Sequence, residues 1–211
     1  NPIKSQIKVA LFNSVVKNNL NIFKYLLSII GNDVNIRSQS EETLLSCSIR
    51  CKSEEIAKEI IDNESFDCLK NNIQAAFLQT YTQKEDKKED ESDGKYIYIN
   101  RQPTQQFKAS IKLMKLLAKF DAEHQHLIDF NKLLPNGKSF YTFMQPYLTN
   151  NDEVAAFLLE CGVDPDAPDK FGDFPLKYFI QNGFVGAALV LIRSGKVELK
   201  RKNTLIEESA F

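Results

Sequence analysis

Pairs of adjacent aliphatic residues recur along the chain, and their spacing constrains the fold more than any other feature of the sequence. The pairs are Leu26-Leu27, Ile60-Ile61, Leu116-Leu117, Leu158-Leu159 and Leu191-Ile192. Successive pairs begin 34, 56, 42 and 33 residues apart. Two of these intervals match a period of about 33 residues. Such a period indicates a solenoid, in which each repeat is too small to bury its own apolar face and stacks on its neighbours.

Each aliphatic pair closes the second of two segments with helical periodicity. Residues 5–30 show this arrangement, with two apolar groups separated by a turn at Lys17-Asn18-Asn19. A turn between helices favours a residue that tolerates the left-handed conformation, which Gly and Asn do best. We expect Asn18, Lys52 and Asn150 to stand at the turn position that Gly183 fills in the last repeat.

The two long intervals have visible sources. The first contains residues 82–106, a mixed charge run with no apolar face, which we expect to be disordered because it cannot offset its ordering entropy. This insertion would split a third repeat whose helices are Asn72–Tyr81 and Phe107–Phe120. The second excess, Asp121–Pro135, predicts an extra helical turn or an elongated loop. Residues 1–211 are therefore expected to form a single repeat domain.

The stretch from Gly172 to Gly195 carries a family pattern. It reads Gly172-Asp173-Phe174-Pro175-Leu176, Gly183, Ala187-Ala188, Leu191-Ile192 and Gly195, and Gly31 with Asp33-Val34-Asn35 supplies the matching inter-repeat portion. The chain resembles the ankyrin repeat family, without the His of that family's Thr-Pro-Leu-His motif. The resemblance implies an all-α, ankyrin-like helical-repeat solenoid of about five helix pairs plus a partial sixth. It also implies short β-hairpin fingers between the pairs.

Composition excludes several function classes. The chain has 211 residues, a net charge of -1 and a pI of about 6.2, so it has no global basic field for nucleic acid. No apolar run reaches the length of a membrane span, and we expect no membrane insertion. Free thiols are expected rather than a disulfide framework, which indicates a reducing, cytoplasmic location. The four cysteines are Cys47, Cys51, Cys68 and Cys161.

The sequence offers little for catalysis or metal binding. Cys47 and Cys51 are not matched by a second cysteine pair of the kind that zinc sites use, and His124 and His126 belong to another repeat. There is no phosphate-binding glycine loop and no nucleophile elbow. We therefore expect no enzyme activity, no metal, no cofactor and no small-molecule substrate.

The leading hypothesis is a scaffold or adaptor that binds another protein. The resemblance implies recognition through hairpin tips and a concave helix face. An aromatic residue at a loop tip, Phe171, is typical of a binding hot spot. The residues that we expect to contact the partner are Arg37, Gln39, Asp169, Lys170 and Phe171.

Two alternatives stay open. Because the chain starts at Asn1 and stops within a repeat, it could be the regulatory ankyrin segment of a larger enzyme, channel or secreted bacterial effector. A helical-repeat enzyme would require a pocket with converging titratable groups near His124 and His126.

Overall fold

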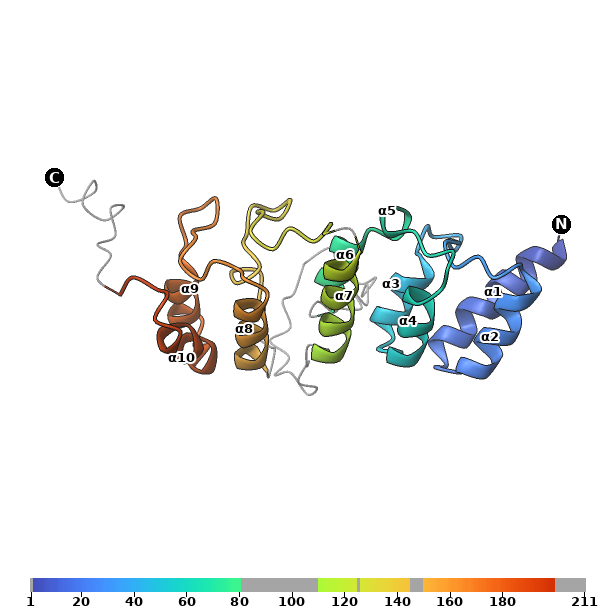
Figure 1. Ribbon diagram of the computed structural model, residues 1–211, viewed down its shortest axis with the longest axis horizontal. Coiled ribbons are helices and arrows are strands. Elements are labelled where there is room, and N and C mark those ends of the chain that lie inside the picture. The colour runs from blue at the N-terminus through green and yellow to red at the C-terminus, as the bar shows by residue number, and fades with distance from the viewer. Residues whose placement is uncertain (1, 81–109, 125, 145–149, 200–211) are drawn as a thin grey trace, which may run out of the picture. The chain divides into compact units, whose positions relative to one another are not determined.

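The computed structural model of the chain describes residues 2–80, 110–124, 126–144 and 150–199 (Figure 1). Its regular structure within these ranges is helical, which confirms the all-α prediction. The predicted hairpin fingers are loops in the same ranges: they contain no strand, and one isolated antiparallel bridge joins Arg37 to Thr43. The chain divides into two compact units, the first ending at Asp129 and the second beginning at Phe130.

The first unit contains three pairs of antiparallel helices within its described residues. The helices are α1 (Pro2–Val16), α2 (Leu20–Ile29), α3 (Leu44–Arg50), α4 (Glu54–Ile61), the short α5 (Cys68–Asn71), α6 (Ile73–Gln79) and α7 (Ile111–Glu123). In each pair the two helices pack side by side: α1 on α2, α3 on α4, and α6 on α7. The first helices stack in the order α1, α3, α6, and the second helices in the order α2, α4, α7. The unit is therefore a stack of two layers.

Polar side chains fix where these helices begin. The side chain of Asn19 accepts the Ile22 N–H at 3.0 Å and caps α2, and Thr43 accepts the Ser46 N–H at 3.0 Å and caps α3. The turns within the pairs use the left-handed conformation as expected, with φ of 49° at Asn18, 55° at Lys52 and 73° at Gly183.

Asn150 corrects the expectation for the fourth such turn. Its φ is -121°, so it does not adopt the left-handed conformation, and it is the N-cap residue of α8. It therefore corresponds to Asn19, the N-cap residue of α2, and not to Asn18.

The third pair frames the long insertion. Helix α6 ends at Gln79 and α7 begins at Ile111, four residues later than predicted. The Ser110 N–H donates to the Thr80 backbone oxygen at 3.0 Å, so the chain resumes beside the point that it left. The insertion at residues 82–106 lies outside the described residues.

In the stretch Asp121–Pro135 the first three residues extend α7 to its end at Glu123, and the described residues after it form a loop, so both a longer helix and an elongated loop contribute. The buried carboxylate of Asp121 accepts the Leu127 N–H at 2.6 Å and the Ile128 N–H at 3.1 Å. These bonds fold the first part of the loop back onto the helix end.

The second unit contains α8 (Asn151–Glu160), α9 (Pro175–Gln181) and α10 (Val185–Arg193). Helix α10 packs on both α8 and α9. Pro175 stands at the start of α9, where its missing N–H costs no helical hydrogen bond. Before α8, residues 139–144 form a helical turn. The core of the unit is aromatic: the ring centroids of Tyr141 and Phe179 are 6.0 Å apart, and those of Phe179 and Phe184 are 5.8 Å apart.

None of the helices in the described ranges has the length and apolar character needed to cross a membrane.

Candidate functional site

The loop at residues 33–43 joins α2 to α3 and is closed by its own hydrogen bonds. The Ser38 N–H donates to the Glu42 oxygen at 2.8 Å, and the Glu41 N–H donates to the Ser38 oxygen at 3.2 Å. Glu41 holds the left-handed conformation, with φ of 61°, at the point where the chain reverses. The loop therefore presents its tip, residues 39–41, in one defined conformation.

Arg37 and Gln39 are both exposed in this loop, as the binding hypothesis requires. The Arg37 guanidinium already has two backbone partners: Nη1 donates to the Glu41 oxygen at 3.0 Å, and Nη2 donates to the Lys70 oxygen at 2.6 Å. It ties the loop tip to α5. Gln39 lies at the tip itself.

The loop at residues 164–174 joins α8 to α9, and in it Asp169 occupies the place that Ser38 has in the first loop. Its side chain is only 6% exposed. One carboxylate oxygen accepts the Phe171 and Asp173 N–H groups at 2.9 and 3.1 Å, and the other accepts the Thr142 hydroxyl at 2.9 Å. The carboxylate is thus occupied within the unit, and its effect is to hold the loop in shape.

Lys170 and Phe171 form the tip of the same loop and are exposed together. Phe171 is 58% exposed, and the Lys170 ammonium lies 5.0 Å from the centre of its ring. The Lys170 N–H donates to the Gly137 oxygen at 2.9 Å, and its aliphatic stem crosses Gly137 so closely that a Cβ there would lie 1.9 Å from the Lys170 Cδ. The loop before α8 therefore contacts this tip and supports it through Gly137.

One asparagine in each unit joins two successive loops. Asn35 Oδ1 accepts the Asp67 N–H at 2.9 Å in the first unit, and Asn131 Oδ1 accepts the Asp164 N–H at 2.9 Å in the second. The partners are 32 and 33 residues apart. The same inter-loop bond therefore recurs at the period of the aliphatic pairs. The Asn131 bond was not anticipated, although its spacing from Asp164 could have suggested it.

Leu69 is an exposed helical residue that the sequence patterns did not indicate. It lies in α5 and is 75% exposed. Helix α5 is a single turn capped by Asp67, whose carboxylate accepts the Leu69 and Lys70 N–H groups, each at 3.0 Å. These bonds lower the pKa of Asp67 below its ordinary value, with the Lys70 N–H as the largest cause. The signal was an Asp at an N-cap position, but four residues are too few for periodicity to identify a helix.

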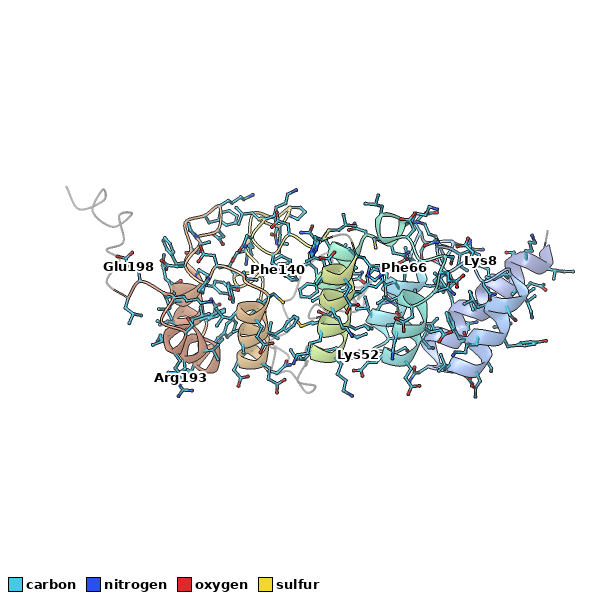
Figure 2. All side chains as sticks on the ribbon, in the orientation of Figure 1. Lys8, Lys52, Phe66, Phe140, Arg193 and Glu198 are labelled. Carbon is cyan, nitrogen blue, oxygen red and sulfur yellow. The ribbon has the colours of Figure 1, made fainter. Side chains whose placement is uncertain are left out.

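A groove of about 580 Å3 lies in the first unit, and His124 is among the residues that line it. It is therefore the pocket in which the alternative of a helical-repeat enzyme would place its catalytic groups. Its walls come from α4, the loop after it and α7; they include Phe66, labelled in Figure 2, and Phe120. His124 stacks on Phe120 with 4.0 Å between centroids, and its Nδ1 lies 2.8 Å from the Phe120 backbone oxygen. His126 does not line the groove. The Glu123 carboxylate pairs with Lys119 at 3.8 Å. The imidazole is therefore engaged by its own helix end.

All four cysteines are free thiols. Burial is the main cause that raises the pKa of Cys47 to about 12 and that of Cys161 to about 11. A raised pKa leaves little thiolate at neutral pH, so neither side chain is an activated nucleophile. Among the residues that the structure describes, no three His, Cys, Asp or Glu side chains converge as a metal site requires.

Comparison with models of known protein families finds no match, and a search of curated proteins finds none either.

Proposed function

We propose that this chain is an ankyrin-like helical-repeat solenoid that acts as a scaffold or adaptor and binds another protein through its inter-repeat loops. Three features support the repeat assignment. The first unit is a two-layer stack, and the asparagine bond between loops recurs in the second unit. The loops 33–43 and 164–174 also have the same backbone hydrogen bonds when 131 is added to the residue numbers of the first loop. In this alignment of the two loops, Ser38 corresponds to Asp169, and Ser40 corresponds to Phe171.

The observation that carries the binding proposal is the exposed Lys170–Phe171 pair on a preorganised tip. A rigid loop loses little conformational entropy when it binds, and an aromatic ring with an adjacent cation offers both apolar contact and charge. Within the proposal, Lys170, Phe171 and Gln39 contact the partner directly. Arg37 and Asp169 hold the two loops in their binding conformation.

The proposal includes no catalytic activity. His124 contacts the Phe120 backbone oxygen, Glu123 pairs with Lys119, and burial raises the pKa of the Cys47 thiol, which favours binding over chemistry. We also propose a reducing, cytoplasmic environment, which four free cysteines in a chain of this size favour.

A regulatory segment of a larger enzyme, channel or secreted effector is the second candidate. It uses the same loops, but the partner is then another domain of the same polypeptide. The sequence that flanks residues 1–211 in the full-length protein separates the two candidates, because an adjoining catalytic or membrane domain would favour the second.

Quantitative affinity purification with wild-type and variant chains tests the binding proposal. Phe171→Ala removes the exposed ring, and we expect it to lower recovery of the specific partners about tenfold or more, as hot-spot truncations do. Ile180→Ala is the matched control, because Ile180 is 64% exposed in the same unit but lies on α9, away from the loop tip. Equal loss with both variants, or no loss with Phe171→Ala, would contradict binding through the tip.

A further inference from the structure

Two lysines of the second unit lie over aromatic rings where two neighbouring loops meet (Figure 1). The Lys170 ammonium is 5.0 Å from the centre of the Phe171 ring. The Lys138 ammonium is 5.4 Å from the centre of the Tyr178 ring. The aliphatic stem of Lys170 crosses Gly137, the residue next to Lys138, so the two lysine side chains are neighbours. We call these two lysines and two rings the lysine–aromatic surface.

Both rings of this surface are attached to fixed parts of the unit. The Tyr178 hydroxyl donates to the Met144 backbone oxygen at 2.9 Å, and its ring lies edge-on to that of Phe184, with 5.9 Å between centroids. The Phe171 N–H donates to the buried Asp169 carboxylate at 2.9 Å. A ring face attracts a cation and orients it without neutralising its charge. The two ammonium groups are therefore presented in defined places with their charge intact.

These positive charges are not compensated by the nearby carboxylates. Among the residues that the structure describes, neither ammonium group forms an ion pair, whereas Lys177 in the same unit pairs with Asp173 at 3.3 Å. The Asp169 carboxylate is buried and accepts hydrogen bonds from within the unit. At the start of the loop, the Asp164 carboxylate accepts the Asp166 N–H at 2.9 Å. The loop tip therefore offers positive charge beside an exposed ring.

We propose that the lysine–aromatic surface binds an acidic peptide segment of the partner protein. This inference rests on the proposed binding through the loop tip and specifies the chemistry of the partner. Carboxylates of the segment meet the two ammonium groups, because complementary charge selects one partner over others. Apolar side chains of the segment contact the exposed part of the Phe171 ring.

Single-stranded nucleic acid also combines with lysines and aromatic rings, but it fits this surface less well. Bases bind by stacking on open ring faces, and here one face of each ring lies under an ammonium group. A continuous phosphate backbone would also approach Asp164 and Asp166 of the same loop, in a chain whose net charge is -1. A peptide can place its carboxylates only where the lysines are, so it avoids this repulsion.

Selection of a random 12-residue phage-display library on the immobilised full chain tests the proposal. We expect the selected peptides to contain Asp and Glu at least twice as often as the unselected library. Selection on K138Q/K170Q should abolish this enrichment. The matched control K115Q/K196Q removes the same charge from two exposed lysines elsewhere and should retain it.

Fluorescence anisotropy with one selected acidic peptide measures the contribution of the charges. K138Q/K170Q should weaken binding at least fivefold, and so should replacing the Asp and Glu residues of the peptide with Asn and Gln. Affinity should also fall as salt is added, because exposed charges are screened. Circular dichroism verifies that the variants fold.

Four outcomes would overturn the proposal. They are selection of no peptides or of neutral ones; acidic enrichment that persists in K138Q/K170Q; equal loss in K115Q/K196Q; and a 12-nucleotide oligothymidylate that binds more tightly than the selected peptide and is lost in K138Q/K170Q. Neutral peptides that Phe171→Ala weakens would contradict an acidic partner and leave binding through the tip intact. Acidic peptides that Phe171→Ala does not weaken would instead contradict the role of the ring, so the two proposals can fail separately.

Discussion

The loops at residues 33–43 and 164–174 have the same backbone hydrogen bonds and different means of holding them. In the first loop the Ser38 hydroxyl accepts the Ser40 and Glu42 N–H groups at 3.2 and 3.1 Å. In the second, one oxygen of Asp169 accepts the two corresponding N–H groups. The second oxygen of Asp169 reaches Thr142, outside the loop, whereas the Ser38 hydroxyl lies 2.9 Å from Ser40 within its own loop.

The difference lies in what the capping side chain reaches. A hydroxyl that bonds only within its loop fixes the turn locally, while a buried carboxylate also fixes the loop to the rest of its unit. The loop that a buried carboxylate anchors carries the exposed Phe171 where the other carries Ser40. Anchoring by a buried carboxylate and an exposed aromatic side chain therefore occur in the same loop, which is consistent with the binding role that we propose.

Removing the Asp169 carboxylate is expected to have the largest effect. Asp169→Ala leaves two loop N–H groups and the Thr142 hydroxyl without their acceptor in a buried place, which should cost about 2–3 kcal/mol, because hydrogen bonds to charged groups are the stronger ones. Ser38→Ala should cost about 1 kcal/mol. Urea denaturation gives the loss of stability, and hydrogen exchange of peptides covering each loop locates it.

Thr142→Val is the matched control for Asp169. It removes only the bond between loop and unit, so exchange in residues 164–174 should rise less than in Asp169→Ala. If Asp169→Ala and Ser38→Ala cost the same, anchoring does not distinguish the loops.

Alkaline pH is expected to have the next largest effect, through the second unit. Tyr141 is fully buried beside the second loop, and its hydroxyl donates to the Val163 oxygen at 3.3 Å. Burial raises its pKa above the ordinary value of about 10. The folded state thus keeps the phenol neutral while the unfolded state ionises, so this stability is complete below pH 10 and is lost as pH rises. At pH 11 the loss is about 1.4 kcal/mol.

Tyr141→Phe isolates this contribution. The variant should lose about 1 kcal/mol at pH 8 with the hydrogen bond, and its stability should fall less between pH 9 and 11 than that of the wild type. Urea midpoints across this range measure the difference. Parallel pH profiles for the two proteins would show that Tyr141 does not carry the effect.

Local patterns predicted the parts of this structure that local chemistry determines. The aliphatic pairs lie in α2, α4, α7, α8 and α10, the second helix of each expected repeat. Asn18 and Lys52 were assigned correctly because a left-handed turn selects a few residue types. Leu116-Leu117 lies six residues before the end of α7, so the lengthened helix, together with the loop that follows it, accounts for the 42-residue interval.

Features that depend on distant contacts were not predictable in the same way. The sequence indicates that Asp169 is an exposed turn residue. In the structure it is buried, and its carboxylate accepts the hydroxyl of Thr142, 27 residues earlier. The support that Gly137 gives to Lys170 likewise joins two loops. The exposure of Ile22, Tyr25 and Ile29 on α2 was not predicted either, because periodicity identifies apolar residues without saying which of them neighbouring elements cover. Helix ends and turns are thus determined by local sequence, while the surfaces that the loops present depend on packing.

The smallest expected effect concerns the residue at which the two loops reverse. Glu41 has a φ of 61° and Gly172 a φ of 79°, so one loop places a side chain where the other has none. Glu41→Gly should stabilise the first loop by up to about 1 kcal/mol, and Gly172→Ala should destabilise the second by about 1 kcal/mol, because a Cβ is strained in the left-handed region. Thermal denaturation measures both changes. A destabilising Glu41→Gly would mean that the unfolded-state entropy of glycine outweighs the strain at this position.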